Sequence, residues 1–199
     1  MTPLSPGNRG PVSRPRRRLW FAALASVPVL FAAFVIVIRA LYPVKYSACV
    51  DASCAEFGLE PSLVYAVIRV ESGFQPGARS PAGAVGLMQL MPSTGAWAAS
   101  EMGIEYSDEV LLDPAANIRL GSFYLRHLLD QFRGDIVTAL AAYNGGVRNV
   151  REWLQRNGKW PLDPADIRFD ETRRFIQRVT FDRRVYEIVY PGYLGKPRG

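Results

Sequence analysis

The sequence of 199 residues is poor in the side chains that most often bind transition metals, with one histidine and two cysteines. A zinc site needs three or four such ligands, and Cys49, Cys54 and His127 do not supply a set with suitable spacing. We therefore expect no metal and no other cofactor. The sequence also lacks a G-x-S-x-G nucleophile motif and a phosphate-binding loop. Carboxylates remain as the groups that could carry out chemistry.

Acidic side chains are absent from the first 45 residues, which hold seven of the 24 basic ones. The net charge of +6 is concentrated there, because residues 46–199 carry the other 17 basic side chains against 18 acidic ones. No arginine-rich stripe interleaved with aromatic residues remains to bind a polyanion. We expect no nucleic-acid partner.

Charge is also absent from residues 19–38, a run of 20 residues that would span roughly 30 Å as a helix. More basic side chains precede this run than follow it, which favours a cytoplasmic N-terminus. We predict a single-pass anchor in the cell membrane, a disordered tail at 1–18 and a linker at 39–45, with the rest of the chain outside. A cleaved signal peptide is the alternative, but its apolar region would be shorter, and the sequence after Ile38 offers at best a poor cleavage site.

The remaining sequence lacks the period-two alternation of strands and any repeat of 20–50 residues. Apolar residues at helical spacing, with Gly58 and Pro61 as boundary signals, predict a chain of helices instead. We expect an all-α domain over residues 46–190, lysozyme-like with at most a small hairpin at 77–90, and a flexible tail at 191–199. The expected helices cover residues 47–57, 61 to about 71, 92–102, 114–132, 136–144, 149–157 and 170–190.

Cys49 and Cys54 fall in the first of these domain helices. On one continuous helix their Cα atoms would be about 8–9 Å apart, beyond the reach of a disulfide. We predict two partly buried thiols, and a bridge only if the helix breaks between them.

Glu71 stands where a predicted helix ends and a loop rich in glycine and proline begins, in "RVESGFQPGARSPAGAVGLMQLMPSTG". Val67, Ile68 and Val70 precede it, and the apolar segment "GLMQLMP" follows within twenty residues. A carboxyl group beside such surfaces is partly desolvated, which raises its pKa toward that of a general acid. A lone glutamate at a helix end is otherwise an ordinary surface residue.

Four ordered motifs make the domain resemble the catalytic domain of the soluble lytic transglycosylase family, lysozyme-like enzymes that cleave bacterial cell-wall glycan. The motifs are "ESGF" from Glu71, "SPAGAVGLMQLMP" from Ser80, "ALAAYNGG" from Ala139 and "ETRRFIQRV" from Glu171. "NIRLGSFYLRHLL" resembles the long central helix of the family. The resemblance extends from about Tyr46 to Tyr190.

The resemblance implies roles for seven residues. Glu71 would be the catalytic acid and base, and Tyr143 would reach toward the sugar or the glutamate. The residues expected to bind substrate are Ser80, Gln89, Met91, Tyr143, Asn144 and Glu171. Structural alternatives remain for some of them: Met91 would serve core packing, Tyr143 would be satisfied internally, and Glu171 would favour the helix dipole.

The implied function is a lytic transglycosylase that acts on peptidoglycan and leaves 1,6-anhydro-muramic ends. Two alternatives stay open. A lysozyme-type hydrolase would need a base to activate water, for which Asp108, Glu109 and Asp113 are candidates without motif support. A wall-binding scaffold would keep the cleft without turnover. Two residues depart from the family pattern: Glu60 at a helix cap, and Arg148 in a loop.

Overall fold

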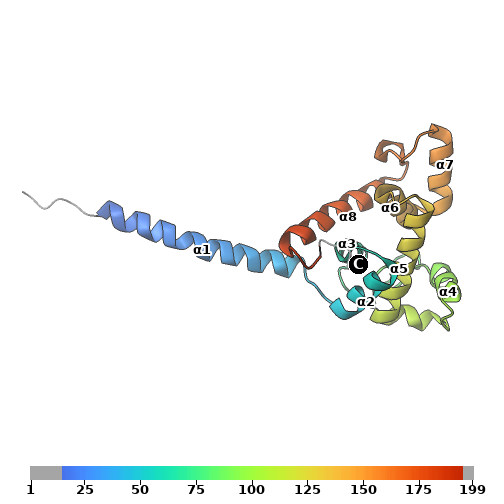
Figure 1. Cartoon of the computed structure of the whole chain (residues 1–199), viewed down its shortest axis with the longest axis horizontal. Helices are drawn as coiled ribbons and strands as arrows, with labels where there is room; N and C mark the ends of the chain where they lie inside the picture. Colours follow the sequence, from blue (N-terminus) through green and yellow to red (C-terminus); the bar gives the residue numbers. More distant parts are fainter. Residues whose placement is uncertain (1–14, 195–199) are drawn as a thin grey trace, which may run out of the picture. The chain divides into compact units, whose positions relative to one another are not determined.

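The computed structural model describes the backbone of residues 15–194 and the side chains of residues 27–194. Two compact units make up the chain, Met1–Leu41 and Tyr42–Gly199. The first contains helix α1, Pro15–Leu41. The helical elements of the second (Figure 1) are α2 (Ser47–Phe57), α3 (Pro61–Ser72), α4 (Pro92–Glu101), the 3-10 turn η1 (Asp108–Leu112), α5 (Pro114–Gln131), α6 (Ile136–Gly145), α7 (Val147–Asn157), the 3-10 turn η2 (Pro164–Asp166) and α8 (Asp170–Val189).

Helix α1 contains the uncharged run at 19–38 and extends past it at both ends. It includes residues 15–18, so their assignment to a disordered tail was wrong; arginine is a good helix former. Residues 1–14 of that tail, and the side chains of residues 15–26, lie outside the described residues. Among the residues that the structure describes, no helix combines the length and apolar character needed to cross a membrane.

Helix α3 lies between α8 and α2 in the domain (Figure 1). Pro61 occupies its first turn, where the missing N–H costs nothing, and Gly73 ends it with a left-handed φ of 58°. Between these ends, every side chain from 61 to 68 is buried. A helix that is apolar on all sides is stable only when neighbours surround it, so α3 forms the rigid centre of the domain and carries Glu71 in its last turn.

Helix α5 is the second support, and it packs against α2, α4 and α6. Asp113 caps it by accepting a hydrogen bond of 2.8 Å from the Ala116 amide. Helix α6 begins in the same way, since Asp135 accepts from the Thr138 amide at 2.7 Å. A cluster of buried side chains joins α4, α5 and the loop before them; its buried members are Val85, Leu90, Ala98, Ala99, Leu111 and Leu120.

The predicted all-helical architecture is confirmed, and each predicted helix of the domain is present within two residues of its expected ends. The described residues contain no sheet. The possible hairpin at 77–90 is reduced to two isolated bridges, Arg79 with Val85 and Val85 with Leu90. Phe169 occupies the cap position of α8. Both cysteines lie on the unbroken helix α2 and form no disulfide with each other, Cys54 buried and Cys49 partly so.

The domain boundaries differ from the predicted ones on both sides. Tyr42, assigned to a linker, is buried, and its hydroxyl donates to Asp182 Oδ1 at 3.0 Å. Leu194, assigned to a flexible tail, is fully buried, and Tyr193 donates to Asp51 Oδ2 at 3.0 Å. The predictions of a linker at Tyr42 and of flexibility at 191–194 were wrong because aromatic side chains bind these segments to the domain. Residues 195–199 lie outside the described part.

Candidate active site

Glu71 is held at the junction between α3 and the loop that follows it. Its neighbour Ser72 fixes this junction, since the Ser72 hydroxyl lies 2.7 Å from the Leu87 carbonyl oxygen and 3.0 Å from that of Ile68. The loop therefore folds back against the helix end. The helix supplies a rigid backbone for the carboxylate, and the returning loop supplies one wall beside it.

The Glu71 carboxyl group has a pKa raised to about 8. Burial is the largest cause, because desolvation disfavours the charged form. The negative charge of Glu171 raises the pKa further, and the positive charge of Arg178 lowers it. Both of these side chains are exposed and project from α8. At neutral pH Glu71 is therefore mainly protonated, which is the state that a general acid requires.

Tyr143 lies next to this carboxyl group. The charge of Glu71 contributes to raising the pKa of Tyr143, after the larger effect of burial. The Tyr143 hydroxyl donates a hydrogen bond of 2.6 Å to the Met88 carbonyl oxygen, and its ring stacks on Phe175 with centroids 6.2 Å apart. The structure thus places Tyr143 beside Glu71, while the Tyr143 hydroxyl already has a hydrogen-bond acceptor within the protein.

A buried asparagine of α5 fixes the loop that carries Met88. The Asn117 side chain accepts from the Met88 amide at 2.8 Å and donates to the carbonyl oxygens of Val85 and Leu111 at 3.0 and 2.9 Å. Gly86 leaves room for it, because a Cβ atom there would lie 2.2 Å from the Asn117 amide nitrogen. The apolar "GLM" segment is thereby held in one path beside the end of α3.

Ser80 and Gln89, predicted to line the cleft, both stabilise the loop itself. Ser80 Oγ accepts from the Ala84 amide at 3.0 Å. Gln89 Nε2 donates to the carbonyl oxygens of Ala78 and Gly86 at 3.1 and 2.9 Å. Gln89 also has a positive φ of 48°, uncommon for a residue other than glycine. These bonds leave the side-chain carbonyl oxygen of Gln89 as its remaining acceptor.

The other predicted substrate-binding residues occupy two places. Met91 is 40% exposed at the start of α4, so it is not part of the core. Asn144, near the end of α6, accepts a hydrogen bond of 2.7 Å from the Thr172 hydroxyl. That bond joins α6 to the first turn of α8, where Glu171 is exposed. Glu171 and Glu71 are thus close enough to interact electrostatically.

Three residues that organise the site were not singled out from the sequence. Ser72 and Asn117 hold the loop, and Arg178 acts on the pKa of Glu71. The sequence signals were the position of Ser72 directly after Glu71 and an amide side chain early in an amphipathic helix. In the described part of the chain, no group of three or more histidine, cysteine, aspartate or glutamate side chains is placed to hold a metal ion.

Comparison with known families identifies the family of this chain. The family model described as "Transglycosylase SLT domain" matches residues 48–162, which is more than half of the chain. The chain belongs to this family. The match contains Glu71, the loop after it and the segment around Tyr143, but ends before Glu171.

Curated relatives of this SLT domain carry names of the same kind. A putative soluble lytic murein transglycosylase of Haemophilus influenzae is 36% identical over 151 residues, which are 74% of this chain and 26% of the relative. The soluble lytic murein transglycosylase of Escherichia coli K12 is 33% identical over 77% of this chain and 24% of its own. The chain thus spans about a quarter of the length of these relatives. A membrane-bound lytic murein transglycosylase C of Yersinia enterocolitica is 35% identical over 53% of this chain and 32% of its own.

Solved structures share the fold of the SLT domain. An inactive mutant of the lytic transglycosylase Slt of Pseudomonas aeruginosa has a TM-score of 0.68 at 38% identity, over 74% of this chain and 24% of that one. A soluble lytic transglycosylase in complex with bulgecin A has a TM-score of 0.73 at 30% identity, over 80% of this chain and 27% of that one.

Proposed function

We propose that the protein is a lytic transglycosylase that cleaves the bond between N-acetylmuramic acid and N-acetylglucosamine in peptidoglycan. The observation that carries this proposal is the half-buried carboxyl of Glu71 at the end of a rigid helix, where desolvation raises its pKa to about 8. Membership of the SLT family and the names of its relatives support the choice of substrate. Bulgecin binding by a solved relative also fits a saccharide-binding cleft.

In this proposal Glu71 acts twice. Its protonated carboxyl gives the proton to the glycosidic oxygen as the bond from that oxygen to C1 of the muramic acid breaks. The N-acetyl group of the substrate stabilises the positive charge that develops at C1. The Glu71 carboxylate then takes the proton of the C6 hydroxyl, whose oxygen bonds to C1 and closes a 1,6-anhydro ring. No water is consumed, and Glu71 ends protonated as it began.

The neighbouring groups suit this cycle. The usual glycosidase pair places a second carboxylate as nucleophile or base, whereas here Glu171 is proposed to keep Glu71 protonated and to orient the sugar. Tyr143 and Asn144 would shape the cleft, and Met91 would offer an apolar contact. The roles of Ser80 and Gln89 would be indirect, through the loop that they hold.

Of the three carboxylates considered as bases for a hydrolase, two accept hydrogen bonds within the domain and the third is exposed. Asp113 caps α5, and Asp108 accepts a hydrogen bond of 2.9 Å from the Tyr106 hydroxyl. Glu109 is exposed in the turn η1. These engagements favour an anhydro-forming reaction over hydrolysis by water.

Digestion of purified sacculi by wild type and by Glu71→Gln tests the proposal. We expect wild type to release muropeptides with anhydro-muramic ends in mass spectrometry. The variant keeps the shape of the side chain without a transferable proton, so cleavage should fall by about 10²–10⁴-fold. Reducing ends would support the hydrolase, binding without release would support a scaffold, and full activity of Glu71→Gln would remove Glu71 from the reaction.

We also propose that residues 19–38 anchor the protein in the cell membrane, with the N-terminus in the cytoplasm and the catalytic domain outside. The support is the uncharged run and the basic residues before it. Fractionation of expressing cells tests this: full-length protein is expected in the membrane pellet, with its domain digested only by protease added from outside. Recovery of a soluble form that lacks residues 1–39 would contradict the anchor and leave the chemistry unchanged.

A further inference from the structure

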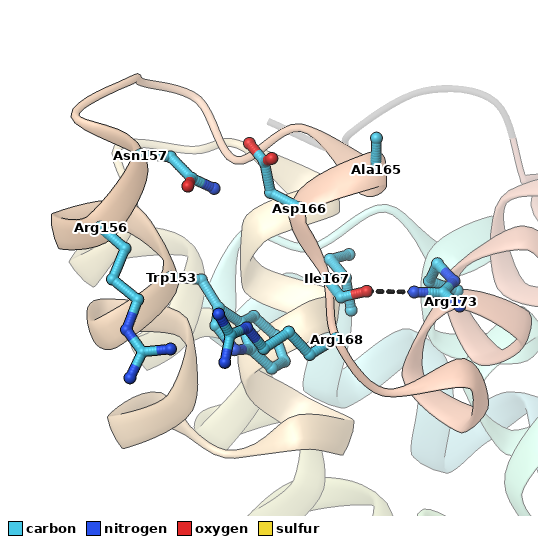
Figure 2. A pocket seen from close by; sticks show the side chains of 8 residues that line it. All are labelled: Trp153, Arg156, Asn157, Ala165, Asp166, Ile167, Arg168 and Arg173. Carbon is cyan, nitrogen blue, oxygen red and sulfur yellow. Dashed lines mark hydrogen bonds between the residues drawn. The ribbon is translucent and has the colours of Figure 1, made fainter.

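A second concave site lies between the end of α7 and the segment that leads into α8. Its volume is about 330 Å³. Figure 2 shows that α7 forms one side and residues 165–168 the other, with Arg168 extending back from its own segment toward α7. The lining residues are Trp153, Arg156, Asn157, Ala165, Asp166, Ile167, Arg168 and Arg173.

Two buried apolar side chains lie beneath the floor of this pocket. Trp153 and Ile167 are 3% and 1% exposed. The Trp153 ring packs edge-on against Phe169 with centroids 5.3 Å apart. Two buried side chains of this kind hold the pocket in one shape, so a ligand would enter a preformed site.

The rim is positively charged, with three arginines and one aspartate. Two of the arginines already have partners: Arg156 pairs with Glu152, and Arg173 pairs with Asp170 and donates to the Ile167 carbonyl oxygen. Arg168 is exposed, and within residues 27–194 it has no hydrogen-bond or ion-pair partner. The pocket therefore offers the guanidinium group of Arg168, while the other two arginines are already paired with carboxylates.

This pocket adjoins the candidate active site. Arg168 precedes Glu171 by three residues, which span at most about 10 Å. The two sites also share a wall at the end of α6: a Cβ atom on Gly145 would lie 3.1 Å from Thr172 Oγ1 and 3.4 Å from Trp153 Cη2. A substrate held beside Glu71 and Glu171 would thus have this pocket within reach of a short branch.

We propose that this pocket binds a carboxylate of the peptide that branches from the glycan strand, with Arg168 as its principal contact. The proposal rests on the proposed function, which makes peptidoglycan the substrate. The N-acetylated sugars of the strand are neutral, and the muramic carboxyl is used up in the amide link to the peptide. The negative charges of the substrate are therefore on its peptides. A guanidinium group matches a carboxylate with two parallel hydrogen bonds.

Cleavage of two substrates by Arg168→Gln tests this inference. One substrate is glycan that bears its peptides, and the other is the same glycan stripped of peptides by an amidase. We expect kcat/KM of Arg168→Gln to fall by about tenfold on peptide-bearing strands, the effect of one charge-assisted hydrogen bond. On stripped strands it should equal wild type. Arg168→Glu should lower the first value further and leave the second unchanged.

Arg184→Gln is the matched control, since Arg184 is also an exposed arginine and lines a different hollow beside Ile136 and Thr180. It should behave as wild type on both substrates. Equal losses for Arg168→Gln on both substrates, or no loss on either, would overturn the inference.

A binding measurement separates this inference from the proposed function. Calorimetry of the full-length Glu71→Gln variant with a synthetic stem tetrapeptide should show binding that Arg168→Gln removes, and a fully amidated tetrapeptide should not bind. Such binding would support the pocket even if no glycan were cleaved. Equal binding of both peptides would overturn it while leaving the role of Glu71 intact.

Discussion

The protonation state of Glu71 is controlled by two side chains of α8 that act in opposite directions. Glu171 raises the pKa of Glu71 and Arg178 lowers it, while burial sets the larger part of the shift to about 8. The acid form is the one that gives the proton, so activity should be retained below this pKa and lost as the pH rises through it.

Paired substitutions of the two α8 residues test this control. Glu171→Gln removes a negative charge, so the alkaline limb of the pH profile of kcat/KM should move to lower pH. Arg178→Gln removes a positive charge, and the same limb should move to higher pH. Each variant is the control for the other, because both neutralise an exposed side chain of one helix. Shifts in the same direction would contradict electrostatic control of Glu71.

At the scale of elements, the wall beside Glu71 depends on how closely the loop at Met88 approaches α5. Gly121 makes that approach possible: a Cβ atom there would lie 2.5 Å from Met88 Sδ and 2.8 Å from Met88 Cβ. Met88 in turn accepts the hydrogen bond of Tyr143. The packing between α5 and the loop therefore positions a residue of α6.

Gly121→Ala should destabilise the domain although alanine is favoured over glycine in helices by about 1 kcal/mol. Overpacking against Met88 should reverse this gain and give a net loss of about 1–3 kcal/mol in the free energy of unfolding. Glycan cleavage should fall as well, because the loop moves. Gly77→Ala is the control, since no atom lies within 4 Å of the added Cβ; a Gly121→Ala variant as stable as this control would contradict the prediction.

The ends of the helices could be predicted from sequence because local chemistry sets them. Gly58 ends α2 and Gly73 ends α3 in left-handed conformations, and Pro61 begins α3. The 3-10 turns η1 and η2 were not predicted, because neither has an apolar period long enough to detect. The path of the loop after Glu71 was also beyond sequence, since it depends on contacts with Asn117, 29 residues along the chain from Met88.

In the candidate site, too, local sequence predicted some features, and long-range packing determined others. The apolar residues around Glu71 predicted a raised pKa, and the value of about 8 agrees. The motifs selected Tyr143 and Glu171. The charge of Glu171 raises the pKa of Glu71, and the charge of Glu71 raises the pKa of Tyr143. Arg178 was missed because its effect arises only when α8 lies against the end of α3, which no local pattern contains. The catalytic and binding roles stay predictions.

At the scale of the whole molecule, one buried carboxylate joins the start of the domain to its two central helices. Asp182 of α8 is 4% exposed and accepts from Arg69 of α3 at 2.7 Å and from Tyr42 at 3.0 Å. The Arg69 guanidinium also lies over the Tyr42 ring, 4.1 Å from its centroid. Three segments far apart in sequence therefore meet at one charge.

Asp182→Ala should lower the free energy of unfolding by about 3–5 kcal/mol, because it leaves the partly buried Arg69 without its carboxylate. Asp130→Ala is the control: Asp130 pairs with Arg126 on the surface with 66% of its side chain exposed, and such pairs contribute about 0–1 kcal/mol. Urea unfolding at pH 7 measures both. Equal losses would show that the Asp182 interactions contribute no more to the free energy of unfolding than a surface ion pair does.

The same junction determines where mechanical load enters the domain. Tension on the chain at residue 41 meets the Tyr42–Asp182 bond first, together with two hydroxyl groups at the C-terminal end of α8. Tyr190, directly after the helix, donates to the Tyr42 carbonyl oxygen at 2.8 Å, and Tyr186 donates to that of Pro43 at 3.1 Å. These bonds connect the start of the domain to the C-terminal part of α8, whereas α2 begins only at Ser47. The helix that takes up this load also carries Glu171 and Arg178, which act on the pKa of the Glu71 carboxyl.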